Sequence, residues 1–545
     1  MAFRQCGLER LLRRLDGRGY RAYRELKGCI TRVDGFEIRV VRVQPDPYAP
    51  PSVVHVMGRL EAPDWALEHP VALADYLYRR LYRALRSAAE RMGEGRSGFL
   101  SVPRPSPVML RRSGLEVSSD GRFIARIWVG LPSRRRRVLG NAAMELLLEK
   151  IPRAIRRVVE GLGGRDLEEH IRVWRLQEEL RSSLPRYRLV AFVGDGSILP
   201  RRCGTCEDPL PGAVPFESPP SLRVEIETSV GAVTGMGVPR GVTVIAGTAF
   251  HGKTTLLEAI QYGIYNHVPG DGRERVVSLR STVKVRAEDG RYVSCVDIST
   301  FIHSLPARID TSCFTTWDAS GATSMAAAVQ EAVEAGAEAI LIDEDTSATN
   351  LLFYDERSAS LIRRKTVTTI AEQAKSMSEK GVSLVIVSSG SAPLLAAADT
   401  VVVMEDYRPR DATREAKQLA TQPGGADYKP PSPRRLVEAP RLEKPRIRET
   451  WLVARNLPSP LNLESNEQLV EEGQLRLLAA LAARLQTLRG MTLRGIAEWL
   501  DKTLEEEGFA GLLGRDIGPD YAEVRGLDLV HMLNRIPGVR MGKTM

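Results

Sequence analysis

The chain has 545 residues, 43% of them hydrophobic and 27% charged, and a formal net charge of +9. This length accommodates two to four domains, and the composition is ordinary for a water-soluble globular protein. No run of about 18 apolar residues occurs, which excludes a membrane-spanning helix, and residues 1–10 lack the apolar core of a signal peptide. We therefore expect a cytoplasmic protein with no membrane partner.

Residues 1–185 predict an N-terminal α+β domain. Helical spacing occurs over residues 20–26 and 73–92, and the alternation typical of strands occurs over 36–43 and 123–129. A helical pattern with one apolar face then covers residues 139–183. The glycines of residues 94–98 superficially resemble a phosphate loop, but no lysine follows, so we interpret them as a turn.

Clustered arginines dominate the charge of this domain, above all Arg134, Arg135, Arg136 and Arg137. Such clusters are typical of polyanion binding, and RNA or another single-stranded nucleic acid is the partner that we expect. The alternative is a solvated basic face, because 68 acidic residues accompany the 77 lysines and arginines. Aromatic residues are not interleaved with the basic runs, so the sequence gives no indication of base stacking.

The chain has six cysteines, and two of them, Cys203 and Cys206, form an isolated C-x-x-C motif. A zinc site needs a second pair of ligands, and a redox motif needs a thioredoxin-like context. Neither is present, so we expect two reduced cysteines in a loop.

Residues 186–405 predict a nucleotide-binding core. An apolar strand pattern over 242–246 and a helical pattern over 256–260 flank a glycine-rich loop, which consists of Gly247, Thr248, Ala249, Phe250, His251, Gly252, Lys253, Thr254 and Thr255. The glycines let the backbone N–H groups surround a polyphosphate. Lys253 reaches the β- and γ-phosphates, and Thr254 offers its hydroxyl to Mg²⁺. A chance glycine-rich turn is the alternative, but the strand–loop–helix context favours binding of a nucleoside triphosphate.

A second apolar strand pattern, over residues 339–342, ends in Asp343 and Glu344. Asp343 is suited to hold Mg²⁺, and Glu344 is suited to deprotonate the attacking water. Upstream, Ser320 and Gly321 begin a helix of small residues. Strand patterns over 222–228, 383–387 and 400–404 complete an α/β sheet that binds its ligand at the carboxyl edge.

The order and spacing of these elements resemble the ABC class of ATPases. Ser320 and Gly321 correspond to its signature, residues 339–344 to its Walker B strand, and the segment with Ser347 and Asn350 to its D-loop. Residues 250–259, 265–274, 296–299 and 341–350 more specifically resemble the family of predicted ATPases of the ABC class, and the likeness extends to residues 22–28, 43–49, 189–193 and 198–201.

This resemblance implies an ABC-type α/β P-loop fold with additional N- and C-terminal domains. It also implies ATP and Mg²⁺ as ligands and a homodimer that forms with ATP. In such a dimer Ser320 and Gly321 act on the nucleotide of the partner subunit. The catalytic residues that we expect are Glu344, Lys253 and Ser389.

The sequence departs from the common ABC pattern at several positions. The signature lacks Leu-Ser-Gly-Gly-Gln, and Asp345 replaces the usual proline after the catalytic glutamate. Ser389 occupies the place of the switch histidine, and a serine cannot carry the positive charge of an imidazole. No glutamine is found where a Q-loop is expected, and Asp297, Ser299 and Thr300 are the polar candidates there. We therefore expect ATP binding with slow turnover.

Residues 406–450 are interrupted by proline and glycine, which predicts a linker or a surface arm. Amphipathic helical patterns over 466–486 and 493–507 predict a compact helical domain over 451–545. We interpret Gln468, Gln474 and Arg476 as part of a solvated helix face.

Three functions are compatible with these features. The first is an ATP-driven clamp, a homodimer that closes around two ATP·Mg²⁺ and moves its attached domains over RNA. The second is a scaffold that binds ATP only to hold a dimer, which the missing histidine favours and Glu344 opposes. The third is a P-loop kinase, which the signature and D-loop disfavour because a kinase needs no helix from a second subunit.

Overall fold

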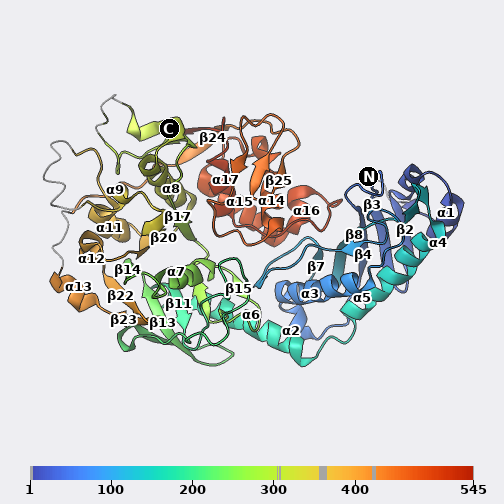
Figure 1. Cartoon of the computed structure of the whole chain (residues 1–545), viewed down its shortest axis with the longest axis horizontal. Coiled ribbons are helices and arrows are strands. Elements are labelled where there is room, and N and C mark those ends of the chain that lie inside the picture. Colours follow the sequence, from blue (N-terminus) through green and yellow to red (C-terminus); the bar gives the residue numbers. More distant parts are fainter. Residues whose placement is uncertain (1–3, 304, 306–308, 355–364, 420–424, 544–545) are drawn as a thin grey trace. The chain divides into compact units, whose positions relative to one another are not determined.

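The computed structural model describes residues 4–303, 305, 309–354, 365–419 and 425–543 (Figure 1). The chain forms two compact units. The N-terminal unit consists of Met1–Trp174, Glu471–Leu477 and Thr503–Glu523, and the ATPase unit consists of Arg175–Val470, Leu478–Lys502 and Val524–Met545. No described helix is long and apolar enough to cross a membrane.

The N-terminal unit is built on a seven-stranded sheet. The strand order is β1-β2-β3-β4-β8-β5, and β7 also pairs with β8. The strands are β1 (Arg4–Gln5), β2 (Cys29–Val33), β3 (Phe36–Arg42), β4 (Ser52–Arg59), β5 (Leu100–Ser101), β7 (Leu115–Val117) and β8 (Arg122–Val129). Alternate residues such as Ile38, Val54 and Ile127 are buried in one core with Leu77 of a helix, which explains the period of two in the sequence.

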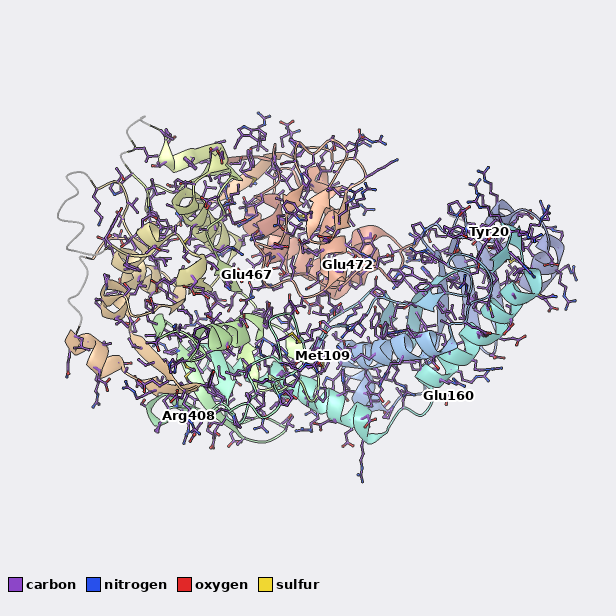
Figure 2. All side chains as sticks on the ribbon, in the orientation of Figure 1. Tyr20, Met109, Glu160, Arg408, Glu467 and Glu472 are labelled. Atoms are coloured by element: carbon purple, nitrogen blue, oxygen red, sulfur yellow. A yellow bond between two sulfur atoms is a disulfide. The ribbon has the colours of Figure 1, made fainter. Side chains whose placement is uncertain are left out.

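Helices cover this face of the sheet. They are α1 (Leu8–Leu15), α2 (Asp64–Leu67), α3 (Pro70–Ala88), α4 (Gly140–Met144) and α5 (Ile151–Val159), with a 3₁₀ helix at Tyr20–Leu26 and a π-helical turn at Glu145–Lys150. Tyr20, labelled in Figure 2, packs edge-on against Tyr23 with ring centroids 5.1 Å apart. The helical pattern predicted over 139–183 is interrupted between α5 and α6 (Arg165–Ser183), where Gly161 and Gly163 adopt positive φ.

Two segments distant in sequence complete the N-terminal unit. Glu471, at the start of α14 (Glu472–Ala482), accepts hydrogen bonds from Arg112 Nε at 3.0 Å and from Ser106 N at 2.9 Å. His55 on β4 contacts the carbonyl of Ile517, after α16 (Gly508–Leu513), with Nε2 at 2.7 Å. Buried polar contacts therefore hold both segments on this unit.

The ATPase unit contains a six-stranded sheet in the order β17-β20-β21-β14-β22-β23. The strands are β14 (Val242–Ala246), β17 (Thr282–Val285), β20 (Ala339–Asp343), β21 (Ser383–Val387), β22 (Thr400–Glu405) and β23 (Arg408–Asp411). The first five in the sheet order are parallel, and β23 runs antiparallel to β22. The α/β P-loop fold and the parallel strands at 383–387 and 400–404 are confirmed.

Helices cover both faces of this sheet (Figure 1). On one face, Ile245, Leu341 and Val385 pack with Leu256 and Ile260 of α7 (Lys253–Tyr262). On the other face, alternate strand residues pack with α8 (Gly321–Ala335), α9 (Thr349–Leu352), α11 (Ile370–Glu379) and α12 (Ala392–Ala397). Thus α7 and α8 lie on opposite faces.

A second sheet covers α7. It is antiparallel, with the order β12-β13-β11-β16, and consists of β11 (Leu189–Gly194), β12 (Arg223–Ile226), β13 (Val233–Pro239) and β16 (Val276–Ser278). The strand predicted over 222–228 therefore belongs to this sheet, and β13 directly precedes β14. A hairpin of β18 (Arg291–Val296) and β19 (Phe314–Ala319) leads into α8.

The described residues of the range 406–450, namely 406–419 and 425–450, contain a helix and strands and are not the predicted linker or surface arm. They contain β23, α13 (Thr413–Leu419), β24 (Arg434–Glu438) and β25 (Arg446–Arg448). β24 pairs with β28 (Arg540–Lys543), and β25 pairs with β26 (Trp451–Val453), which pairs with β27 (Leu461–Asn462). Tyr428 is fully buried and donates its hydroxyl to Gln330 Oε1 at 2.6 Å, which anchors the segment despite its prolines.

The remaining C-terminal elements combine helices with the strands just described. The helices are α14, α15 (Leu493–Glu506), α16 and α17 (Gly526–Leu533). The interpretation of Gln468 and Gln474 as a solvated face is wrong, because both are buried. Gln468 precedes α14, and its amide donates to the carbonyls of Gln261 and Thr282, both at 3.2 Å.

All six cysteines lie within the described ranges, and each is paired. The disulfides are Cys6–Cys29, Cys203–Cys206 and Cys295–Cys313. The prediction that Cys203 and Cys206 are reduced is therefore wrong. The turn brings their Cα atoms within 4.9 Å, which is inside the range that a disulfide requires.

Candidate nucleotide-binding site

The glycine-rich loop connects β14 to α7 at the carboxyl edge of the sheet. Gly247, Phe250 and Gly252 have φ of 134°, 68° and 94°, so the loop folds through left-handed conformations. A Cβ atom on Gly247 would lie 2.6 Å from the carbonyl oxygen of Met404 on β22. Glycine is required there because the loop packs directly against the neighbouring strand.

The loop offers its charged and N–H groups to a ligand. Lys253 Nζ donates to the carbonyls of Gly247 at 2.6 Å and Thr248 at 2.8 Å, so the ammonium group lies across the loop. No side chain caps the start of α7, which leaves its N-terminal dipole available. Lysine, uncapped helix and left-handed glycines together fit the phosphates of a nucleotide.

Asp343 ends β20, and its carboxyl is buried at 3% exposure. Burial raises the pKa of this carboxyl, and the N–H of Asp345, at 3.2 Å from Oδ1, partly opposes the rise. A buried carboxylate with few hydrogen bonds fits a divalent cation, because a cation stabilises the charged form. The carboxylate of Asp343 and the exposed hydroxyl of Thr254 are oxygen groups of the kind that Mg²⁺ prefers.

The structure brings Glu344 and Ser389 together. The backbone N–H and the hydroxyl of Ser389, just beyond β21, donate to Glu344 Oε2 at 2.8 Å and 3.2 Å. Both bonds converge on one carboxylate oxygen, and no described residue donates a hydrogen bond to Oε1, so this oxygen is available to accept a proton. The residue in the place of the switch histidine thus contacts the carboxylate that we expect to be the base.

Ser320 and Gly321 begin α8 (Gly321–Ala335). Ser320 is the N-cap, and its hydroxyl accepts from Thr323 N at 3.5 Å. α8 contacts β17, β18, β19, α9 and α17, on the face opposite to α7. Among the described residues, no hydrogen bond or ion pair joins Ser320 to Lys253.

The predicted D-loop lies directly after Walker B. Ser347 donates its hydroxyl to the carbonyl of Asp343 at 2.6 Å, and Asn350 is exposed on α9. Ser347 thus fixes the end of β20, and Asn350 remains available to a partner.

Comparisons with known proteins agree with this arrangement. A family model of the P-loop domain of ABC ATPases matches residues 163–439, and a model of the N-terminal domain of ATPases of the ABC class matches residues 5–162. The chain belongs to this family of ABC-class ATPases. The resemblance identified from the sequence is confirmed.

A relative from Methanocaldococcus jannaschii, described as an uncharacterized protein, is 34% identical over 243 residues. The match spans 43% of this ABC-class ATPase and only 54% of the relative. Among solved structures, an ATP-binding cassette of an ABC transporter in its ADP conformation is 13% identical, with a TM-score of 0.24, over 37% of this chain and 94% of its own. The cbiO1 component of an ABC transporter complex from Clostridium perfringens is 15% identical, with a TM-score of 0.23, over 41% and 87%.

The polar candidates for a Q-loop make other contacts in this ABC-class ATPase. Thr300 donates its hydroxyl to Gln373 at 2.5 Å, and Asp297 accepts from Ser299 and pairs with Lys429 at 3.2 Å. A different segment lies at the carboxyl edge beside the Walker B strand. It follows β17 and begins at Arg286. Glu467, labelled in Figure 2, pairs with Arg286 at 3.3 Å.

One contact of the phosphate loop was not predicted. The N–H of Asp406, in the turn between β22 and β23, donates to His251 Nδ1 at 2.8 Å. Tyr407 in the same turn approaches Gly252, where a Cβ atom would lie 3.2 Å from its ring. In the sequence, Asp406 and Tyr407 appear only as a turn after an apolar strand, and that pattern does not indicate a contact with His251.

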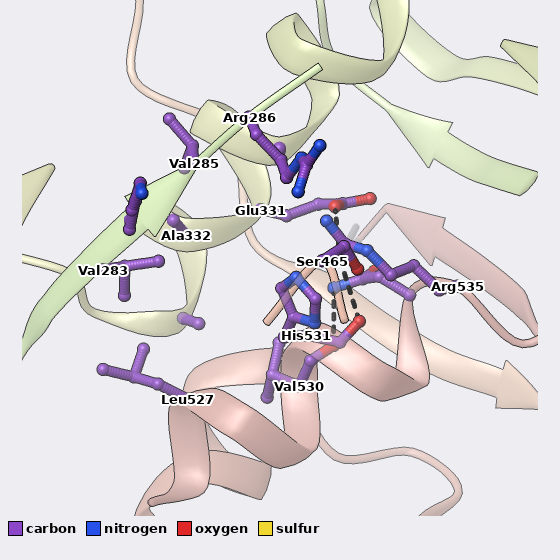
Figure 3. A pocket seen from close by; sticks show the side chains of 14 residues that line it. Val283, Val285, Arg286, Glu331, Ala332, Ser465, Leu527, Val530, His531 and Arg535 are labelled. Atoms are coloured by element: carbon purple, nitrogen blue, oxygen red, sulfur yellow. Dashed lines mark hydrogen bonds and ion pairs between the residues drawn. The ribbon is translucent and has the colours of Figure 1, made fainter. Parts of the chain in front are cut away.

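A buried ionic cluster connects α8 to α17. Glu288 pairs with Arg535, and Arg291 pairs with Glu331 at 2.8 Å. Beside it lies a cavity of about 30 Å³, into which His531 and Ser465 project (Figure 3). Among the described residues, His531 Nδ1 and Ser465 Oγ are buried without a hydrogen-bond partner, so a bound water fits here. We interpret the cluster as support for α8 and not as a ligand site.

The predicted nucleic-acid residues form the tip of a hairpin in the N-terminal unit. Arg134 is the last residue of β9 (Ser133–Arg134), Arg137 is the first residue of β10 (Arg137–Val138), and all four arginines are exposed. Arg135 and Arg136 occupy the turn with φ of 49° and 54°. Glycine and asparagine are the usual residues in such turns. Arg135 and Arg136 therefore have an unfavourable backbone propensity at these positions.

Proposed function

We propose that this ABC-class ATPase binds ATP·Mg²⁺ between two copies of the chain, hydrolyses it slowly, and acts as a clamp on RNA. The observation that carries the proposal is the placement of α7 and α8 on opposite faces of the sheet. A signature helix that does not pack against the helix of its own phosphate loop is available to the nucleotide of a second copy. Two copies related by a two-fold axis then share two equivalent sites.

Hydrolysis rests on the pair of Glu344 and Ser389. Glu344 Oε1 accepts a proton from the attacking water, and the two donors of Ser389 hold the carboxylate in place. Lys253 would bind the β- and γ-phosphates, and Thr254 and Asp343 would hold Mg²⁺, which would supply charge neutralisation during phosphoryl transfer. Because serine is uncharged, it gives the γ-phosphate less stabilisation than an imidazolium would.

The arginine hairpin supports a polyanionic partner. A left-handed conformation costs an arginine about 1 kcal/mol or more. Arg136 pairs with Asp46 at 3.3 Å and Arg137 donates to the carbonyl of Gly17 at 2.9 Å, and these exposed contacts offset part of that cost. Fixed, exposed guanidinium groups bind phosphates, and single-stranded RNA presents phosphates at regular intervals.

Mixing two inactive variants tests the shared site. In a heterodimer of Lys253→Ala with Ser320→Arg, one site carries both defects and the other carries none. We expect each variant alone to be inactive and the mixture to recover part of the ATPase activity. If heterodimers form and no activity returns, the site is contained in one chain.

Lys253→Ala also tests nucleotide binding directly. At a nucleotide concentration of 100 Kd, binding stabilises the parent by about 2.7 kcal/mol, which a thermal melt detects. We expect no such stabilisation of Lys253→Ala. An equal shift in both proteins would contradict the assignment of the phosphate loop.

The second candidate function is a scaffold in which ATP holds a dimer without turnover. Ser389 in the place of a histidine favours it. A dimer that forms with ATP and persists without phosphate release, with or without RNA, would support the scaffold over the clamp.

A further inference from the structure

Two exposed aromatic side chains lie beside the two halves of the proposed shared site. Phe250 in the phosphate loop is 93% exposed, and Trp317 on β19, three residues before Ser320, is 63% exposed. Both belong to the ATPase unit. Large apolar side chains this exposed indicate a surface that is covered in another state of the protein.

The backbone at Phe250 is held in a conformation that aromatic residues seldom adopt. Its φ of 68° lies in the left-handed region, where glycine is the favoured residue. The phosphate loop needs this conformation to present its N–H groups, but it does not need a phenyl ring. The ring is almost fully exposed to solvent and therefore available to a second surface.

Trp317 adjoins an aromatic groove through its contact with Tyr292. Its ring lies 4.9 Å from that of Tyr292, and Tyr292 and the partly exposed Trp451 line a groove of about 580 Å³. The hydroxyl of Tyr292 donates to the carbonyl of Val539 at 2.8 Å, so the wall of the groove is fixed. Asp289, which also lines it, would lie 3.3 Å from a Cβ atom on Gly321, so the groove adjoins the start of α8.

The charges of this groove do not suit a polyanion. Arg286, Arg291 and Arg535 line it, and each pairs with a carboxylate, of Glu467, Glu331 and Glu288 respectively. Asp289 and Glu464 add further negative charge. An apolar ring therefore fits better than a phosphate chain.

We propose that Phe250 of one copy packs against Trp317 and the adjoining groove of a second copy when two ATPase units close on ATP. The inference rests on the proposed shared site, because only there does a phosphate loop face the start of α8. Ser320 and the loop then contact the same γ-phosphate, and Trp317 lies at most about 10 Å along the strand from Ser320. The two-fold axis repeats the contact, so four aromatic residues flank the two nucleotides.

Cross-linking tests the contact. Phe250→Cys and Trp317→Cys are introduced into separate chains, both carrying Glu344→Gln so that ATP is retained, and the chains are mixed and exposed to a mild oxidant. All six native cysteines are described and paired, so they do not compete. We expect a disulfide-linked heterodimer with Mg·ATP and little without it. The control pairs Phe250→Cys with Leu419→Cys on α13, which is 86% exposed.

A second measurement uses Trp317→Ala, followed by sedimentation. We expect ATP-dependent dimerisation about tenfold weaker than that of the parent, as for an aromatic residue central to an interface. The affinity of the monomer for ATP should not change, since Trp317 lies outside the phosphate loop. Leu419→Ala should dimerise like the parent.

The outcomes separate this inference from the proposed function. If the parent dimerises with ATP but the 250–317 pair links no better than the control, the aromatic contact is wrong and the shared site stands. If the parent does not dimerise with ATP, both are wrong. If Trp317→Ala dimerises normally but binds RNA more weakly, the groove is a nucleic-acid surface and the inference is overturned.

Discussion

The contact between Ser389 and Glu344 yields the sharpest test of the catalytic site. Ser389→Ala removes the hydroxyl that lies 3.2 Å from Glu344 Oε2 and leaves the backbone N–H at 2.8 Å. The carboxylate then loses one of its two described donors. We expect a lower kcat, because the base is less firmly oriented toward the attacking water.

The structure sets the size of this effect. A hydrogen bond to a charged group contributes about 1.5–3 kcal/mol. The bond here is long and Ser389 is exposed, so we expect the low end of that range or slightly less, about 1 kcal/mol. Since 1.36 kcal/mol is a factor of ten in rate, kcat should fall about fivefold.

Single-turnover and steady-state phosphate release measure this fall, and a double-mutant cycle assigns its cause. Glu344→Gln should lower kcat by about 10²–10⁴ because the amide cannot act as the base. In that background Ser389→Ala should have no further effect. The reasoning is refuted if Ser389→Ala lowers kcat equally in both backgrounds, or changes KM alone.

Three further predictions concern other parts of the chain. Burial raises the folded-state pKa of Asp343, so the free energy of unfolding falls as the pH rises from the pKa of the unfolded state through the pKa of the folded state. Asp343→Asn should therefore have a higher melting temperature than the parent at pH 7 without Mg²⁺, and it should lose the Mg²⁺-dependent part of the stabilisation by ATP. A melting temperature below that of the parent would contradict this prediction. Replacing Arg135-Arg136 by Asn-Gly should stabilise the hairpin, by about 1 kcal/mol or more, yet weaken RNA binding and flatten its salt dependence; unchanged binding would mean that the arginines only solubilise the surface. Thiol titration of the unfolded protein should find no reactive thiol before reduction and six after it. Two reactive thiols before reduction would instead support the reduced state that the sequence predicts for Cys203 and Cys206.

The catalytic core is the part of the fold that the sequence predicts well. β14, β20 and β21 are buried throughout, so each appears as a short apolar run that ends in polar residues. Parallel strands place those polar ends at one edge of the sheet. Local patterns therefore suffice to bring Ser389 close to Glu344.

Other features depend on contacts that no local pattern encodes. Glu471 belongs to the N-terminal unit because its carboxylate pairs with the buried Arg112, which is 359 residues away. Gln468 is polar in sequence but buried, since backbone carbonyls satisfy its amide. In residues 406–450, a few buried side chains such as Tyr428 outweigh the many prolines. A composition rich in proline and glycine predicts a flexible segment because it does not show which few side chains are buried.

The same geometry connects nucleotide chemistry to the proposed clamp. One chain carries a phosphate loop after β14 and a signature helix, α8, that packs on the face of the sheet opposite to α7. In the clamp that we propose, ATP bridges two copies, and hydrolysis by Glu344 sets the lifetime of the closed dimer. In that scheme an uncharged Ser389 in place of histidine lengthens this lifetime. We therefore expect Ser389→His to shorten the closed state, most strongly below about pH 6.5, where the imidazole is protonated. A closed state whose lifetime does not change with this substitution would separate clamp opening from hydrolysis.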